Sequence, residues 1–401
     1  MNYAKITTWV LKVLSKFIKV PTAPLIEGEN SILRIANYCQ MRGFNKVLIV
    51  TAPFITASEK LVPLYEKLRN ANIEFCVFDK VEREPNFDLC EEVKHTALEE
   101  KADVIVAVGG GSVIDLCKVV CCGVTDDRPL NKFAGILKVR KKPLPLFAVP
   151  TTAGTGSETT YISVVSDSTG QKKTIVSPKI VPALAVLDPM FLVNMPNKLL
   201  ASTGIDALAH AVESYLTTNT KSGHDFYAPT AVKLIFSNLK KCINEPDNLV
   251  AREKMLKASY LAGISMNNEM VGYAHAFAHQ LGAFYHIPHG EAIALVLVRV
   301  LRFEADKCQN KLAQLGVAIG LDESLGEELL AKLFIEKVAN LIREINLPQH
   351  TKAVQKNDYE QIINNAFKET AFRYPVCKFM TKEDAFKFLD RLDEEDVILW
   401  D

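Results

Sequence analysis

The sequence lacks the patterns that mark several classes of protein. No hydrophobic run reaches the ~18 residues that a membrane-spanning helix requires, and none of the nine cysteines forms a C-x-x-C pair. Lys plus Arg and Asp plus Glu are equal at 47, so no excess charge attracts nucleic acid over the whole surface. With 401 residues, 48% of them hydrophobic, the chain is typical of a globular protein of two or three domains.

The cysteines are scattered along the chain rather than grouped. Their spacing does not support a thiolate zinc site, and it favours reduced core thiols over a disulfide framework. Reduced thiols are typical of a reducing compartment, so we expect a cytoplasmic protein.

The first 26 residues contain no Asp or Glu but four lysines. Hydrophobic residues from Ile6 to Phe17 recur at helical spacing, and the lysines fall on the opposite face. The pattern predicts a basic amphipathic helix over residues 1–20 that packs on the body or on another subunit. Attachment to a membrane surface is an alternative, as is a cleaved organellar presequence, although the lack of arginine counts against the latter.

Strands alternate with helices in the first half of the chain, which predicts a parallel sheet covered on both faces. Turn-forming residues at 167–170, between two β-rich runs within 159–187, predict a hairpin. The strands are expected at 46–51, 74–78, 103–108 and 146–149, and the helices at 58–70 with Ser58 as its cap, at 87–100, and from 112 to about 122.

Beyond Pro196 the strand signal stops and helical periodicity continues nearly to the end, in runs such as 226–243, 249–266 and 324–346. We therefore expect an α/β dinucleotide-binding domain with a Rossmann-like parallel sheet at 21–195. An all-helical, metal-binding domain is expected at 196–401.

A glycine loop, Gly109–Ser112, stands between a predicted strand and a predicted helix. Glycines let a ligand approach the backbone, and the start of a helix offers free N–H groups to a phosphate. The loop matches neither G-x-G-x-x-G nor a Walker motif, so a tight turn is the alternative.

A threonine loop, Pro150–Glu158, follows the fourth predicted strand. It brings hydroxyl groups to the carboxyl edge of the sheet, where open α/β folds bind ligands. Two such loops on one sheet favour a dinucleotide. Lys173, in the predicted hairpin, could reach a phosphate, although a lysine beside a turn is usually only solvated.

Histidines gather in two short hydrophobic segments. Asp206 and His210 are four residues apart, as are His275 and His279, so each pair shares one face of a helix. His289 follows just before a glycine. Hydrogen-bonded core histidines are the alternative, but this pattern predicts a site for Fe(II) or Zn(II). Asp206 and the four histidines are one group more than the ligand set is expected to use, so one histidine should lie outside it. Periodicity does not choose between His275 and His279.

Together these motifs resemble the iron-containing (group III) alcohol dehydrogenase family from about Pro24 onward, with Asp115 and Lys118 following the glycine loop. The resemblance implies a dehydroquinate synthase-like architecture. It implies Asp206, His210, His275 and His289 as metal ligands and His279 as an additional histidine near substrate and nicotinamide. It implies that NAD or NADP is contacted by Gly110, Gly111, Ser112, Thr151, Thr152, Thr155, Asn86 and Lys173.

The sequence departs from this family at Ala52. Many members carry there an Asp that accepts hydrogen bonds from the adenosine ribose, so Ala52 removes a charge that would repel the 2′-phosphate of NADP. We therefore expect the protein to tolerate NADP as a cofactor. The second departure is the N-terminal helix, which the resemblance does not cover.

The function expected is the interconversion of an alcohol and an aldehyde or ketone, with the metal polarising the substrate oxygen and His279 relaying a proton. The alternatives are a hydroxyacid–oxoacid transhydrogenase, another enzyme of this architecture, or a non-catalytic scaffold. The partners expected are a small alcohol or aldehyde and a second copy of the chain in a homodimer, with no nucleic acid.

Overall fold

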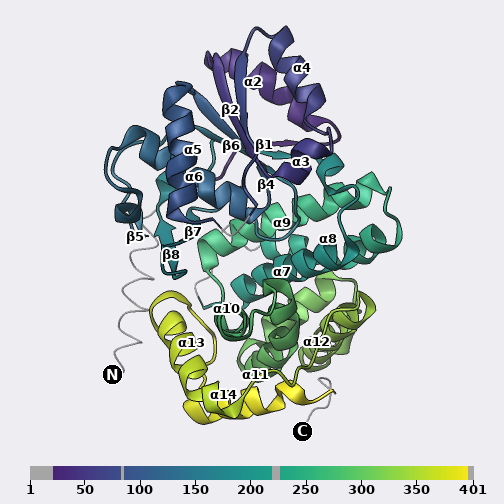
Figure 1. Ribbon diagram of the computed structural model, residues 1–401. Coiled ribbons are helices and arrows are strands. Elements are labelled where there is room, and N and C mark those ends of the chain that lie inside the picture. Colours follow the sequence, from purple (N-terminus) through teal and green to yellow (C-terminus); the bar gives the residue numbers. More distant parts are fainter. Residues whose placement is uncertain (1–20, 83–84, 219–225, 396–401) are drawn as a thin grey trace. The chain divides into compact units, whose positions relative to one another are not determined.

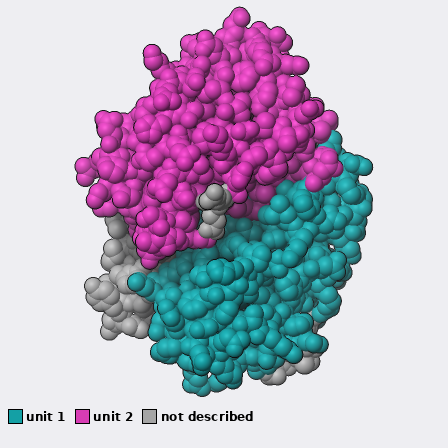
Figure 2. All heavy atoms as spheres, in the orientation of Figure 1, with its two compact units in different colours: residues 1–19, 195–401 teal, residues 20–194 magenta. Residues whose placement is uncertain are grey.

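The computed structural model describes residues 21–82, 85–218 and 226–395 (Figure 1). The described residues fall into two compact units, one up to Asn194 and one from Met195 onward, shown in different colours in Figure 2. The predicted helix over residues 1–20 lies outside the described residues.

The first unit is built on a six-stranded parallel sheet in the order β1-β9-β6-β4-β2-β3, which confirms the predicted α/β class. The inner strands β2 and β4 are almost continuously hydrophobic, and all their residues except Lys46 are buried, as expected for strands covered on both faces. The strands are β1 Leu25–Glu27, β2 Lys46–Thr51, β3 Glu74–Phe78, β4 Val104–Gly109, β6 Leu146–Pro150 and β9 Leu184–Leu187.

Two hydrophobic clusters cover the two faces of this sheet. Alternate residues of β2 and β4, such as Leu48 and Ile105, pack with α5 and α6. Their neighbours Val47 and Val104 pack on the other face with α2 and α4. The helices of this unit are α2 Arg34–Arg42, α3 Pro53–Ala57, α4 Val62–Asn70, α5 Phe87–Glu99 and α6 Gly111–Thr125.

A smaller sheet, in the order β5-β8-β7, contains the predicted hairpin. Strands β7 Ile162–Ser166 and β8 Lys172–Val176 pair antiparallel around the turn at 167–170, and β5 Gly135–Ile136 adds a parallel edge. This prediction is confirmed.

The expected start of the helix at 58–70, with Ser58 as its cap, is wrong. Ser58 ends α3, and α4 begins only at Val62. Glu59 adopts a left-handed conformation (φ 59°), which breaks the helix, and Pro63 suits the first turn of the next one.

The second unit is helical, and no strand occurs among its described residues. Helix α7 is buried along most of its length and packs against α8, α9 and α11. The helices are α7 Asn197–Leu216, α8 Tyr227–Asn244, α9 Leu249–Glu269, α10 Tyr273–Tyr285, α11 His289–Ala318, α12 Glu327–Glu344, α13 Tyr359–Arg373 and α14 Lys382–Asp390.

Short 3₁₀ helices complete the two units, at Ser31–Leu33, Leu130–Phe133, Pro178–Ile180, Pro189–Leu192, Glu323–Leu325, Lys356–Asp358 and Arg391–Asp393. Within the described part of the chain, no helix has the length and hydrophobicity needed to cross a membrane.

One pair of cysteines corrects the expectation of reduced thiols throughout. Cys308 and Cys377 form a disulfide, while the other seven cysteines are free. The pair is separated by 69 residues. Cys308 lies at a kink of α11, and Cys377 in the segment after α13. Spacing along the chain carries no signal for such a distant pairing.

Candidate metal centre and nucleotide loops

Three polar side chains lie one above another inside the buried helix α7. Asp206, His210 and Glu213 occupy positions i, i+4 and i+7, which share one face of a helix. Their exposed fractions are 4%, 7% and 2%. A buried stripe of this kind must be satisfied by partners from other elements, and α10 and α11 supply them.

Asp206 is the centre of the cluster. Its Oδ1 atom lies 3.2 Å from Nε2 of His289, 3.5 Å from Nε2 of His275 and 3.9 Å from Nε2 of His210. Ligand atoms of Asp206, His210 and His275 all lie within 4.8 Å of one another. One carboxylate and three imidazoles thus converge on one point.

Several atoms of the cluster are buried without a hydrogen-bonding partner. They are Oδ1 of Asp206, Nε2 of His275 and Nδ1 of His210. Leaving buried polar atoms unpaired destabilises a fold unless something else binds them. The first two atoms face each other, so a cation between them would satisfy both.

The electrostatics of the cluster favour a cation. Burial alone would raise the pKa of Asp206, but His210 and His289 hold it well below its usual range. Burial alone would lower the pKa of His275, but the carboxylates of Asp206 and Glu213 raise it to about 9. Burial lowers the pKa of His210 to about 4, which keeps this imidazole neutral and able to ligate.

Glu213 holds the far side of His275. Its Oε1 accepts a hydrogen bond from the backbone N–H of Ala274 at 2.6 Å, and its Oε2 lies 2.5 Å from Nδ1 of His275. An ionised carboxylate only accepts, so Nδ1 of His275 is the donor. The remaining nitrogen, Nε2, then faces Asp206.

His289 is the first residue of α11, and Gly290 follows it. Gly290 allows α11 to begin against α7, since a Cβ atom there would lie only 2.2 Å from the backbone oxygen of Ser202. The contact fixes where His289 stands.

His279 lies at the edge of the cluster. Its ring centroid is 5.2 Å from that of His289, and 41% of its side chain is exposed. Its Nδ1 is 2.8 Å from Oε1 of Glu369, which also accepts a hydrogen bond from the hydroxyl of Tyr374 at 2.6 Å. The geometry therefore favours His275 over His279 as the ligand, a choice that periodicity left open.

In the other unit, the glycine and threonine loops follow neighbouring strands, because Gly109 of β4 is paired with Pro150 of β6. Gly110 is the N-cap of α6, so α6 begins at Gly111 with Ser112 in its first turn. A Cβ atom on Gly111 would lie 2.8 Å from Thr155, so the two loops touch. Such an approach suits a ligand held by the start of α6.

The other predicted cofactor residues lie at different places in this unit. Thr151 and Thr152 follow β6, and Ala52 follows β2 at the same edge of the sheet. Asn86 caps α5, with its side chain accepting from the N–H of Leu89. Lys173 is paired with Asp167 of its own hairpin at 3.1 Å.

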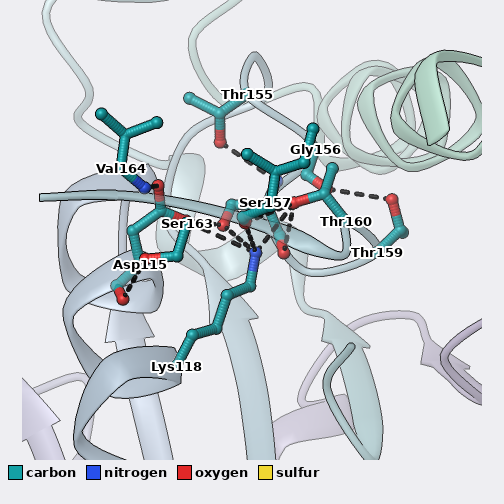
Figure 3. Close-up of polar contacts among 10 residues, drawn as sticks. Asp115, Lys118, Thr155, Gly156, Ser157, Thr159, Thr160, Ser163 and Val164 are labelled. Carbon is teal, nitrogen blue, oxygen red and sulfur yellow. Dashed lines mark hydrogen bonds and ion pairs between the residues drawn. The ribbon is translucent and has the colours of Figure 1, made fainter. Parts of the chain in front are cut away.

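Glu213 is a residue of the cluster that the sequence patterns did not identify, although it continues the Asp206–His210 stripe at i+7. Asp115 and Lys118, which follow the glycine loop, are one turn apart on α6, and both side chains reach the threonine loop (Figure 3).

The chain is similar to known proteins over most of its length. Residues 22–189 match the family model "Iron-containing alcohol dehydrogenase", and residues 200–392 match "Fe-containing alcohol dehydrogenase family, C-terminal". Alcohol dehydrogenase 4 of Saccharomyces cerevisiae is 31% identical to this chain, and the match covers 92% of this chain and 96% of the yeast protein. The 1,3-propanediol dehydrogenase of Citrobacter freundii is 36% identical, and the match covers 87% of this chain and 92% of the dehydrogenase.

Solved structures agree with this. A crystal structure of 1,3-propanediol oxidoreductase superimposes with a TM-score of 0.88 at 32% identity, covering 94% of this chain and all of the other. Sulfoacetaldehyde reductase from Bifidobacterium kashiwanohense, solved in complex with NAD+, superimposes with a TM-score of 0.86 at 26% identity. The match covers 94% of this chain and 99% of the reductase.

Proposed function

Because this chain belongs to the iron-containing alcohol dehydrogenase family, we propose that it is a metal-dependent NAD(P) oxidoreductase that interconverts an alcohol and an aldehyde or ketone. The observation that carries the proposal is the buried cluster around Asp206, in which three imidazoles meet one carboxylate and two facing polar atoms lack partners.

Asp206, His210, His275 and His289 are the residues that would hold the metal, and their nitrogen-rich donor set suits Fe(II) or Zn(II). A bound divalent ion supplies Lewis acidity that polarises the substrate oxygen. Glu213 holds the N–H of Nδ1 of His275, so Nε2 is the nitrogen that would lose its proton and ligate the metal.

The start of α6 and the threonine loop are the residues that would bind the dinucleotide. Backbone N–H groups at Gly111 and Ser112 suit the pyrophosphate, and the hydroxyls of Thr151, Thr152 and Thr155 offer further contacts. A bound nicotinamide supplies the hydride acceptor.

Two further parts of the proposal concern the choice of cofactor, at Ala52, and proton transfer, at His279. Ala52 places no carboxylate at the end of β2, so NADP is expected to be accepted beside NAD. His279 takes the proton of the substrate hydroxyl and passes it toward Glu369, its hydrogen-bonding partner.

Asn86 and Lys173 keep their expected role as cofactor contacts, and binding would have to draw Lys173 from its pair with Asp167. We also propose a domain boundary between 195 and 196, a homodimer and a cytoplasmic location. The homodimer rests on the base rate of two-fold assemblies.

The test is anaerobic purification, metal analysis, and absorbance at the NAD(P)H band with a panel of primary alcohols. About one Fe or Zn per chain is expected, with alcohol-dependent reduction of the cofactor that a chelator abolishes and Fe(II) or Zn(II) restores. Bound metal without reduction of the cofactor by any alcohol would contradict the dehydrogenase and favour the transhydrogenase or another enzyme of this architecture.

A further inference from the structure

A lysine is completely buried in the α/β unit, behind the threonine loop. The side chain of Lys118, on α6, is 0% exposed. A buried ammonium group must find a partner for every proton, because its desolvation is otherwise strongly unfavourable.

The three shortest contacts of the Lys118 ammonium are made with groups that follow β6. Its Nζ donates to Oγ of Ser157 at 2.8 Å, to Oγ1 of Thr160 at 2.8 Å and to the backbone oxygen of Ile162 at 2.7 Å (Figure 3). The three hydrogens of the ammonium are thereby used.

Asp115, one turn earlier on α6, completes the arrangement. Its Oδ1 lies 3.4 Å from Nζ of Lys118 and accepts the hydroxyl hydrogen of Ser157 at 2.5 Å. Its Oδ2 accepts from the N–H of Val164 at 2.8 Å. The two side chains of α6 thus bind the end of the threonine loop and the start of β7 (Figure 3).

The opposite end of the threonine loop is tied to the glycine loop. The N–H of Thr151 donates to the backbone oxygen of Gly109 at 3.0 Å, and Thr155 lies against Gly111. The loop has no regular secondary structure between these anchors. Its position relative to the start of α6 therefore depends on the Lys118–Asp115 pair.

We propose that Lys118 and Asp115 are positioning residues for the dinucleotide. They hold the threonine loop against the start of α6, so that the hydroxyls of the loop and the N–H groups of the helix face one ligand. Order that exists before binding does not have to be created by the ligand, and affinity rises accordingly. The inference rests on the proposed function, since it assumes that these two loops bind NAD(P).

The test measures the affinity of the metal-loaded full-length protein for NAD+ and NADH by titration calorimetry. Lys118→Met removes the donor protons and the charge but keeps a long unbranched chain. Its Kd and KM for the cofactor are expected to rise at least tenfold. The metal content and the kcat at saturating cofactor are expected to stay within about threefold, because the metal cluster lies in the other unit.

Three further variants make the test specific. Lys132→Met changes an exposed lysine of the same unit and is expected to bind as the wild type does. Lys118→Arg is expected not to restore affinity, because a guanidinium is larger and planar. Thr160→Val has nearly the same shape and removes one acceptor, so a several-fold rise in Kd is expected if Lys118→Met does not fold.

Each outcome has a definite meaning. A folded Lys118→Met protein with wild-type Kd would overturn the proposal, as would an unfolded one accompanied by a Thr160→Val protein with wild-type Kd. Equal losses of metal content and cofactor affinity would also overturn it, since they indicate a general structural defect. Failure of the wild-type protein to bind either nucleotide would instead count against the proposed function.

Discussion

Glu213 determines which nitrogen of His275 faces the metal ligands. The carboxylate is buried and accepts from Nδ1, so the other nitrogen is directed at Asp206. Carboxylate partners of this kind orient ligating imidazoles and raise their basicity. The strength of metal binding should therefore depend on a residue that would not touch the metal.

Glu213→Gln keeps the size of the side chain and removes its charge. Metal affinity is expected to fall roughly 10- to 100-fold, which is typical when a side chain that hydrogen-bonds a metal ligand is removed. Competition with a chelator, followed by metal analysis, measures it. Glu344→Gln, at an exposed position, is the control. Unchanged affinity in the first variant would mean that His275 is oriented by packing alone.

His279 is expected to act on protons rather than on metal binding. His279→Ala should leave the metal content unchanged and lower turnover roughly 10²- to 10⁴-fold, the usual contribution of a proton-transferring side chain. The loss should shrink as the pH rises, because the alcohol then loses its proton more readily to solvent. A pH–rate profile measures this, and a profile identical to that of the wild type would rule out the relay.

Glu158 predicts a pH-dependent stability. Its carboxyl group is 1% exposed, with Oε1 unpartnered, and burial raises its pKa from 4.5 to about 7. The folded state then binds more protons than the unfolded state between these values. This residue therefore lowers the free energy of unfolding progressively from about pH 4.5 to pH 7.

Glu158→Gln removes that dependence. The variant should gain stability relative to the wild type as the pH rises from 5 to 8, by at most about 3 kcal/mol, at about 1.4 kcal/mol per pKa unit. Urea unfolding at both pH values measures the gain, with the exposed Glu92→Gln as control. A difference that is the same at both pH values would show that Glu158 titrates normally.

At the residue scale, the sequence was informative where partners are close along the chain. Asp206 and His210 share a helical face at i,i+4, and the structure brings them together as predicted. The contact between Glu213 and His275 joins residues 62 apart, and local periodicity carries no information about it. The disulfide between Cys308 and Cys377 was missed for the same reason.

At the scale of helices and strands, hydrophobic runs identified β2 and β4 because both faces of these strands are buried. The expected helix at 58–70 began too early, since the left-handed Glu59 is a property of the folded loop rather than of residue type. The junction of α7 and α11 is likewise set by a contact between distant residues, Ser202 and Gly290.

Gly290→Ala tests that junction. The added Cβ would lie 2.2 Å from the backbone oxygen of Ser202, so α11 must move. The free energy of unfolding is expected to fall by about 1–3 kcal/mol, with weaker metal binding because His289 is the adjacent residue. Thermal unfolding and chelator competition measure both effects.

Gly282→Ala is the matched control on α10. Its Cβ would approach only the backbone oxygen of Ile287, at 3.4 Å, which is ordinary contact. Stability should stay the same or rise slightly, since alanine favours a helix. If both variants behaved alike, close approach at Gly290 would not be what places α11.

At the scale of the whole molecule, each unit carries one of the two candidate sites. The metal cluster belongs to Met195–Asp401, and the glycine and threonine loops belong to Val20–Asn194. The α/β unit also has its own hydrophobic clusters on both faces of its sheet. The two ligands should therefore stabilise different parts of the chain.

Differential scanning calorimetry of the metal-free protein is expected to show two transitions. Zn(II) or Fe(II) should raise the transition of the helical unit, and NADH that of the α/β unit. Each ligand adds about 2.7 kcal/mol at a hundredfold excess over its Kd. Asp206→Asn should abolish the response to metal and keep the response to NADH. A single transition raised by either ligand would instead show that the two units unfold together.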